Sequence, residues 1–135
     1  MTLSDPTPRG RLAVVTCMDA RIDPLALLGL ELGDAHVMRN AGGRVTDDVL
    51  RGLRLSVGDF GTSTIVLIEH TECAAGITDH DAALADDIEV IAATAELADV
   101  DVVGLVFDLM TEQLRSPRHH SGATPTKHGV ATLEG

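Results

Sequence analysis

Short apolar runs alternate with amphipathic stretches along this chain of 135 residues. Four runs have the length and composition of buried strands: residues 11–16, 35–39, 64–68 and 101–107. Residues 113–115 follow the last of them and are predicted to form a short return strand. The alternation of strands with helices predicts an α/β fold, a single domain with a mostly parallel central sheet flanked by helices.

Three helices are predicted between these strands. The first begins at Asp23-Pro24, because proline is favoured at the first helical position, and it ends at Gly33. The second begins at the capping residue Thr46, and the third covers about residues 82–98. The side chains predicted to face the core are Leu25, Leu28 and Leu32 in the first helix and Val49, Leu50, Leu53 and Val57 in the second.

Proline, glycine and polar residues gather at the two ends of the chain. Residues 1–10 are predicted to be an irregular arm, and residues 11–116 hold all of the predicted elements of the α/β domain. Residues 117–135 are polar and contain further prolines and glycines, so we expect a disordered tail there.

The chain carries a formal net charge of −11, and Lys127 is its only lysine. This charge argues against a nucleic acid partner and against an anionic membrane surface, because both call for a basic face. We expect neither a membrane span nor a signal peptide, since no apolar run is long enough and no basic start precedes one; a cytoplasmic location follows. The acidic composition fits a high-salt host and equally a GC-rich genome.

Two segments with metal-binding side chains each leave the carboxyl end of a predicted strand. They are residues 17–21 (CMDAR) and residues 70–73 (HTEC). The carboxyl ends of parallel strands meet at one edge of a sheet, where sites form. In a reducing cytoplasm a disulfide between the two cysteines is not expected, and zinc accepts thiolate and imidazole ligands in tetrahedral array. The residues predicted to gather around one Zn²⁺ are Cys17, Asp19, His70 and Cys73.

Two roles are open to Asp19. It could ligate zinc and close the site. Alternatively, Arg21 could pair with it, because alternate residues of an extended segment point the same way and guanidinium binds carboxylate with two parallel hydrogen bonds. A fourth position would then remain for water, whose proton Asp19 would accept, and an open position is what separates catalytic from structural zinc.

Together with two further stretches, these motifs resemble the β-class carbonic anhydrases. The matching pieces are residues 17–21 (CMDAR), 39–43 (RNAGG), 70–73 (HTEC) and 104–108 (GLVFD). Their order and spacing are similar to those of compact bacterial and archaeal members. Against that pattern the chain is shortened before Cys17, where the family usually has a helical arm, and after Cys73, where a helical segment is missing. Glu72 and Ala74 stand where the family commonly has Asp and Gly.

The resemblance implies a carbonic anhydrase, a lyase with one Zn²⁺ per chain. Cys17, His70 and Cys73 would bind the metal, with Asp19 as an exchangeable fourth ligand and catalytic residue and Arg21 as its catalytic partner. The implied reaction is reversible hydration of carbon dioxide to bicarbonate and a proton by zinc-bound hydroxide. The resemblance also implies a homodimer or a dimer of dimers with the metal near the subunit interface.

Two alternatives use the same residues. Hydrolysis of a related small molecule such as carbonyl sulfide would need the same zinc site. A catalytically silent homologue, stabilised by zinc and acting as a binding or scaffold protein, would keep Asp19 on the metal permanently. The two shortened segments favour this second alternative.

The other polar residues are predicted to have structural roles. Arg39 and Asn40 are expected to fix their loop or the subunit interface, and Gly42 and Gly43 to let the backbone turn beside the site. His36 is expected to pack or lie at the surface, and His80 to be solvated. The remaining predictions are exposed helix-start charges at Asp86 and Asp87, and histidines at 119, 120 and 128 in the disordered tail.

Overall fold

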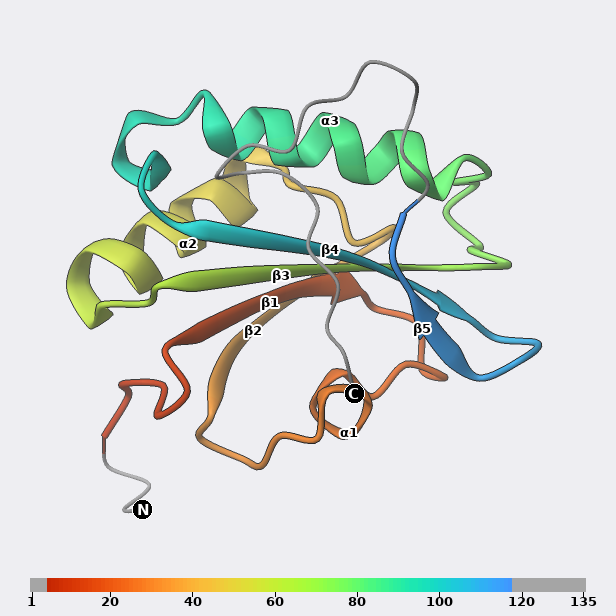
Figure 1. Ribbon diagram of the computed structural model, residues 1–135, viewed down its shortest axis with the longest axis horizontal. Coiled ribbons are helices and arrows are strands. Elements are labelled where there is room, and N and C mark those ends of the chain that lie inside the picture. The colour runs from red at the N-terminus through yellow and green to blue at the C-terminus, as the bar shows by residue number, and fades with distance from the viewer. Residues whose placement is uncertain (1–4, 118–135) are drawn as a thin grey trace.

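Five strands form one sheet in the order β2-β1-β3-β4-β5 in the computed structural model, which describes residues 5–117 (Figure 1). Strands β1 to β4 run parallel to one another, and β5 runs antiparallel to β4. The strands are β1 (Leu12–Cys17), β2 (Ala35–Asn40), β3 (Thr64–His70), β4 (Asp101–Asp108) and β5 (Gln113–Arg115). The predicted single-domain α/β fold with a mostly parallel sheet is confirmed.

Helices cover both faces of this sheet. The long helices α2 (Asp47–Phe60) and α3 (His80–Ala92) lie on one face, and the short helix α1 (Pro24–Leu28) lies on the other (Figure 1). A single 3₁₀ turn, η1 (Ala95–Leu97), leads from α3 into β4. None of the helices within residues 5–117 is long and apolar enough to cross a membrane.

The first helix is shorter than its sequence predicts. It begins as expected, with the Asp23 side chain accepting the Ala26 amide, but it ends at Leu28 because Gly29 takes a left-handed conformation with φ 68°. The amide of Gly29 then bonds back to the last turn. The predicted end at Gly33 is therefore wrong, and so is the inner position of Leu32, whose residue surface is 68% exposed.

The third helix is displaced from its predicted range of 82–98. It begins at His80, because the Asp79 side chain accepts the Ala82 amide and caps the first turn. It ends at Ala92, and the remainder of the predicted range forms η1 and its flanking turns. The second helix begins after Thr46 as predicted, with the Thr46 hydroxyl accepting the Val49 amide.

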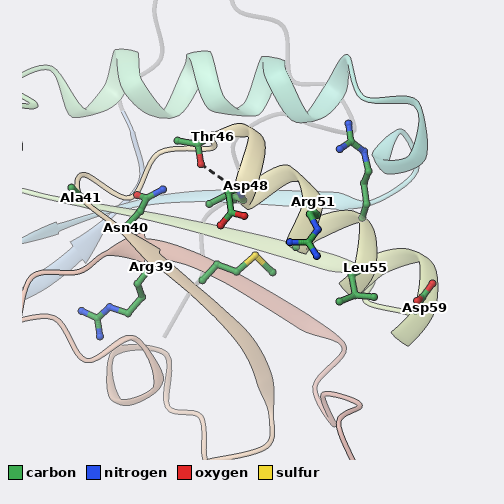
Figure 2. A pocket seen from close by; sticks show the side chains of 12 residues that line it. Arg39, Asn40, Ala41, Thr46, Asp48, Arg51, Leu55 and Asp59 are labelled. Atoms are coloured by element: carbon green, nitrogen blue, oxygen red, sulfur yellow. Dashed lines mark hydrogen bonds between the residues drawn. The ribbon is translucent and has the colours of Figure 1, made fainter.

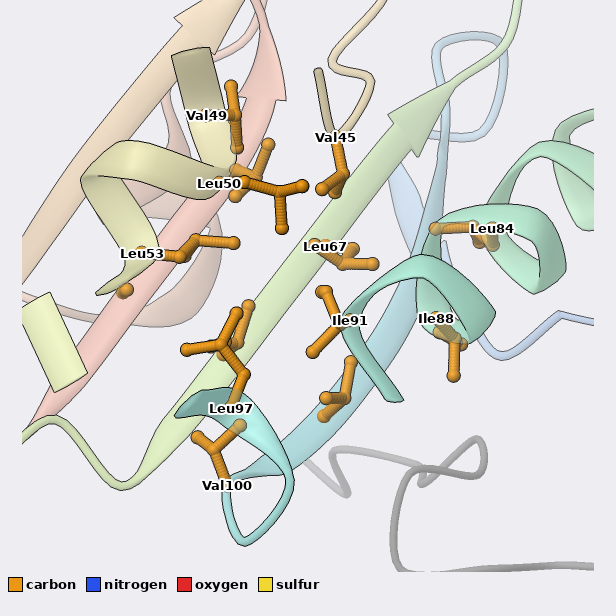
Figure 3. Packing of buried hydrophobic residues seen from close by; sticks show 14 of the residues in the cluster. Val45, Val49, Leu50, Leu53, Leu67, Leu84, Ile88, Ile91, Leu97 and Val100 are labelled. Atoms are coloured by element: carbon orange, nitrogen blue, oxygen red, sulfur yellow. The ribbon is translucent and has the colours of Figure 1, made fainter. Parts of the chain in front are cut away.

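Aliphatic side chains fill the space between the sheet and its helices. On the α2 and α3 face, Leu53, Leu67 and Ile91 are almost fully buried (Figure 3). A second cluster on the α1 face includes Val14 and Ile68. Full burial of one such side chain stabilises the fold by roughly 1.5–3 kcal/mol, so the aliphatic core needs no large aromatic contribution.

Strand register brings the predicted site residues to one edge. Cys17 pairs with Asn40 at the end of β2, and Thr16 pairs with Ile68, two residues before His70. The carboxyl ends of three strands therefore meet beside one another. The irregular arm, as far as residues 5–10 describe it, bonds backbone to backbone with Gly33 and Asp34. The predicted tail, apart from Pro117, lies outside the described residues.

Candidate metal centre

Three metal-ligating side chains converge at this edge of the sheet. Cys17 is the last residue of β1, His70 is the last residue of β3, and Cys73 follows three residues later. One ligand atom from each of the three lies within 4.8 Å of the other two. Cys17 and His70 are buried and Cys73 is half-buried. Two segments that are far apart in sequence thus form one S, N, S donor set.

A tight turn after β3 returns Cys73 to the site. Glu72 has φ 55°, a left-handed conformation that is uncommon for a residue with a side chain. The turn is anchored on β4, where the Thr71 amide donates to the Phe107 carbonyl and the Leu109 amide donates to the Thr71 hydroxyl. The Glu72 carbonyl in turn accepts a hydrogen bond from Arg21 at 3.2 Å, so the turn is held at Thr71 and at Glu72 itself.

The state of His70 fits a metal ligand. Its Nδ1 lies 2.7 Å from the Thr71 carbonyl, which can only accept, so Nδ1 carries the hydrogen and Nε2 presents its lone pair. Nε2 is buried and has no hydrogen-bond partner among the described residues. A second ring nitrogen bound to a carbonyl is the usual arrangement of metal-binding histidine. The donor types suit Zn²⁺ in tetrahedral coordination.

The thiols also suit a cation at this position. Burial raises the pKa of the Cys73 thiol, and the nearby Cys17 raises it further. The Cys73 thiol therefore resists ionisation in the polypeptide alone. A divalent cation between the two thiols would favour the thiolate forms, because metal coordination deprotonates thiols.

Asp19 lies beside this donor set but is held by Arg21. The Arg21 Nε donates to Asp19 Oδ1 at 3.0 Å, and a terminal nitrogen donates to Oδ2 at 2.7 Å. These hydrogen bonds hold the pKa of Asp19 well below its usual range. Asp19 Oδ2 is 3.8 Å from His70 Nε2, so the carboxylate adjoins the site while it stays paired with arginine.

Arg39 fixes the turn that carries Asp19. Its guanidinium donates to the carbonyls of Cys17, Asp19 and Ile22 at distances of 2.8–3.0 Å. Arg39 was predicted to fix its own loop or the interface, and the structure shows that it holds the turn after β1 instead. The side chain acts across β2 and β1 and does not point into the donor set.

The loop after β2 turns beside Cys17, as predicted from its glycines. Gly42 and Gly43 have φ 92° and 65°, both in the left-handed region. The Gly42 amide donates to Cys17 Sγ at 3.4 Å. Asn40 closes the loop by bonding both the amide and the carbonyl of Arg44, at 3.0 and 2.8 Å.

A small apolar hollow opens next to the donors. Its volume is about 500 Å³. Its walls are Cys17, Met18, Asp19, Ala20, Ala41, Ala74 and Ala75. Short aliphatic walls around one carboxylate can admit a small uncharged molecule, as the aliphatic composition predicts.

A larger hollow of about 920 Å³ lies between β2 and α2 (Figure 2). Arg51, Leu55 and Asp59 of α2 line it, and Arg39 points away from that helix. Neither cysteine nor His70 belongs to its walls. The candidate site is therefore the smaller hollow.

Two titratable residues differ from their sequence-based predictions, and a third was not anticipated. Asp87, predicted to be an exposed helix-start charge, lies in the middle of α3, is only 4% exposed and pairs with Arg44. His80 is half-buried rather than solvated, and its Nδ1 has no partner among residues 5–117. Glu69 was not singled out by the sequence, yet its residue surface is only 2% exposed. Burial is the main cause that raises the pKa of Glu69 to about 8, and the negative charge of the nearby Asp87 adds to it.

His36 has the packing role predicted for it. Nδ1 is 2.7 Å from the Ser56 hydroxyl and Nε2 is 2.9 Å from the Pro6 carbonyl. Its ring meets Phe60 edge to face at 5.3 Å between ring centres. The predicted histidines of the tail lie outside the described residues.

A family model described as carbonic anhydrase matches residues 12–83, slightly more than half of the chain. Among curated proteins, β-carbonic anhydrase 1 of Mycobacterium tuberculosis is 52% identical over 66 residues, covering 49% of this chain and 40% of the relative. A carbon disulfide hydrolase of Acidithiobacillus thiooxidans is 53% identical over 66 residues, covering 47% of this chain and 33% of the relative. The aligned part thus spans less than half of either relative.

The fold matches solved structures over most of its length. The crystal structure of a carbonic anhydrase from Streptococcus mutans superposes with a TM-score of 0.79 and 35% sequence identity. The match covers 87% of this chain and 88% of that one. The family-model match over residues 12–83 includes the strands and loops that carry Cys17, His70 and Cys73.

Proposed function

This chain belongs to the β class of the carbonic anhydrase family, and we propose that it is a zinc lyase that reversibly hydrates carbon dioxide to bicarbonate and a proton. One observation carries the proposal: His70 Nε2 is buried beside two cysteine sulfurs and has no hydrogen-bond partner among residues 5–117, while Arg21 holds the neighbouring Asp19. Donor set and carboxylate together provide a metal position with a proton acceptor beside it.

Cys17, His70 and Cys73 would hold the zinc ion. When bound, zinc supplies a Lewis acid that lowers the pKa of water towards neutrality. Asp19 accepts a hydrogen bond from the attacking water and orients it, since its carboxylate is ionised at every physiological pH. Arg21 keeps that carboxylate aimed and away from the metal position. The alanine-lined hollow receives the uncharged substrate.

The aligned part of the chain is short compared with its curated relatives, so properties of a whole protein are proposed as well. We propose a zinc-binding domain over residues 11–116, a cytoplasmic location, and a homodimer or dimer of dimers. The proposed oligomer follows from the family resemblance. Met18, which lines the smaller hollow, is 65% exposed and is available for contact with a second subunit.

Stopped-flow measurement of carbon dioxide hydration tests the proposal. Zinc-loaded full chain should hydrate the gas above the buffer rate, with activity rising from about pH 6.5 to 9, because zinc would bring the pKa of a bound water into this range. His70→Ala, prepared in the same way, should fall to the buffer rate. Absence of hydration by the zinc-loaded chain across this pH range contradicts the proposal.

Hydrolysis of a sulfur analogue is a second candidate. Several of the similar curated proteins are carbon disulfide hydrolases, and the hollow beside the donors is mostly apolar. Carbon disulfide and carbonyl sulfide are, like carbon dioxide, linear and uncharged, so the same residues would act on them. Parallel assays with the three compounds, reading hydrogen sulfide release for the two that contain sulfur, assign the substrate.

A catalytically silent, zinc-stabilised scaffold is separated from both enzymes by Asp19. In an enzyme, Asp19→Asn should retain zinc and lose about 10²–10⁴-fold in rate, as for removal of a positioned proton acceptor. In a scaffold with Asp19 on the metal, the same change weakens zinc binding and there is no rate to lose. The paired measurements are zinc content and hydration rate.

A further inference from the structure

The loop Asn40–Arg44 is pressed against the backbone of Cys17. A Cβ atom added to Gly43 would lie 2.8 Å from the Cys17 nitrogen, and one added to Gly42 would lie 2.7 Å from Ile77 Cδ1. The loop is therefore wedged between the end of β1 and the segment after Cys73. In this position the Gly42 amide donates to Cys17 Sγ.

An ion pair between the half-buried Arg44 and the buried Asp87 fixes the far end of this loop. Arg44 Nε donates to Asp87 Oδ2 at 2.9 Å, and a terminal nitrogen donates to Oδ1 at 3.2 Å. The Val45 amide donates to the same Oδ2 at 3.2 Å. Two guanidinium bonds and one amide bond give the loop a fixed distance and orientation relative to α3.

Arg44 is shared by this ion pair and by the closure of the loop. Its amide and carbonyl bond to Asn40, while its guanidinium binds Asp87. The Gly43 amide also donates to the Asn40 carbonyl at 3.3 Å, so the hydrogen bonds from Asn40 to Arg44 and Gly43 close the loop that carries Gly42. The connection from α3 to the sulfur runs through Asp87, Arg44 and the Gly42 amide.

We propose that Arg44 and Asp87 are positioning residues of the metal centre, which hold the Gly42 amide against the Cys17 sulfur and so raise its affinity for the metal. An N–H donor takes up part of the thiolate charge and orients the sulfur lone pairs. Groups that orient metal ligands in this way typically contribute 10–100-fold to metal affinity. The inference rests on the proposed function for the presence of the metal.

The test must separate positioning from folding. Removing one partner leaves a buried charge unpaired, whereas replacing both partners by neutral groups usually preserves stability. The variant Arg44→Met/Asp87→Asn removes both charges and keeps an oxygen for the Val45 amide. Arg44→Lys is a second variant, which keeps the charge but loses the two-nitrogen fork.

An ion pair elsewhere on α3 provides the matched control. Arg115 binds Asp81 at 3.0 Å, is 36% exposed like Arg44, and connects the start of α3 to β5 without touching the loop. The control variant Arg115→Met/Asp81→Asn removes an ion pair of the same chemistry from the same helix.

Zn²⁺ affinity is measured by competition with a chromophoric chelator, and the Co²⁺ form gives the sulfur-to-cobalt absorption band. For Arg44→Met/Asp87→Asn the proposal predicts Zn²⁺ binding that is weaker by about tenfold or more and a shifted Co²⁺ band. Arg44→Lys should lose an intermediate amount of Zn²⁺ affinity. The control should change in Zn²⁺ affinity by less than about twofold. Wild-type affinity and an unshifted band in either folded Arg44 variant would overturn it. Failure of the wild-type chain to bind metal, or equal binding by Cys17→Ala, overturns the proposed metal site itself.

Discussion

Arg21 binds both carboxylate oxygens of Asp19, at 3.0 and 2.7 Å, and so holds the carboxylate 3.8 Å from the Nε2 of His70 rather than in the donor set. A second contact fixes the guanidinium, because a terminal nitrogen also donates to the Glu72 carbonyl at 3.2 Å. Arg21 thus connects the turn after β1 to the turn after β3. Asp19 can reach the metal position only by breaking its hydrogen bonds to Arg21.

Arg21→Gln should release Asp19 and lower the hydration rate. Without the guanidinium the carboxylate is free to occupy the fourth metal position, so we expect a 10–100-fold fall in kcat/KM with unchanged zinc content. Arg51→Gln, on the exposed face of α2, is the control and should retain the wild-type rate. A rate for Arg21→Gln within twofold of wild type would show that this pair does not govern the site.

Gly43 and Gly29 allow the crowding beside Cys17 to be measured. Both have left-handed φ angles, 65° and 68°, but a Cβ at Gly29 meets nothing within 4 Å. Gly29→Ala should cost about 1–2 kcal/mol of unfolding free energy from backbone strain alone. Gly43→Ala should cost a further 1–3 kcal/mol, as overpacking does, and weaken metal binding as well. Urea unfolding measures the free energy of unfolding of both variants. Equal losses of this free energy in Gly29→Ala and Gly43→Ala would refute the close approach of loop and strand.

His80 should make stability depend on pH. Burial lowers the pKa of His80, and nearby His70 and Arg115 lower it further. A lowered pKa means that the unfolded chain binds the proton more readily than the folded chain does. The contribution of His80 to the free energy of unfolding is therefore fully present above the unfolded histidine pKa of about 6.5, and it is lost as the pH falls below that value. Thermal unfolding between pH 5 and about 8 should show a smaller acid loss for His80→Gln than for wild type. Parallel curves for the two proteins would contradict the assignment.

Metal removal should lower thermal stability. A ligand that binds only the folded state at a hundred times its Kd stabilises it by about 2.7 kcal/mol, which corresponds to a Tm change of roughly 10 °C for a chain of this size. Calorimetry before and after treatment with a strong chelator measures this change. The variant Cys73→Ala should show almost no response to the chelator, and a response equal to that of wild type would place the metal elsewhere.

The sequence predicts β1, β3 and β4 well because their apolar runs are continuous and almost every residue in them is buried. It predicts the ends of α1 and α3 less well. Gly29 and Gly33 are both plausible helix ends, and a helix of five residues depends on capping and packing more than on propensity. The Asp79 cap likewise competes with the apolar periodicity that indicated a later start for α3.

The metal donors could be anticipated because each follows a strand end, where chain order alone brings them together. The surroundings could not. Asp87 shares the inner face of α3 with Leu84, Ile88 and Ile91, a spacing that marks it as buried, but its partner Arg44 is 43 residues away in sequence. Periodicity shows that such an acid faces inward, whereas only the tertiary structure shows which cation meets it.

Diffraction from crystals of the zinc-loaded full chain, recorded above and below the zinc absorption edge, tests the central claim most directly. The account predicts one anomalous peak per chain within bonding distance of Cys17 Sγ, His70 Nε2 and Cys73 Sγ, with Asp19 still paired to Arg21 and a water at the fourth position. A peak at any other set of side chains, or Asp19 bound to the metal at the pH of full activity, would contradict it.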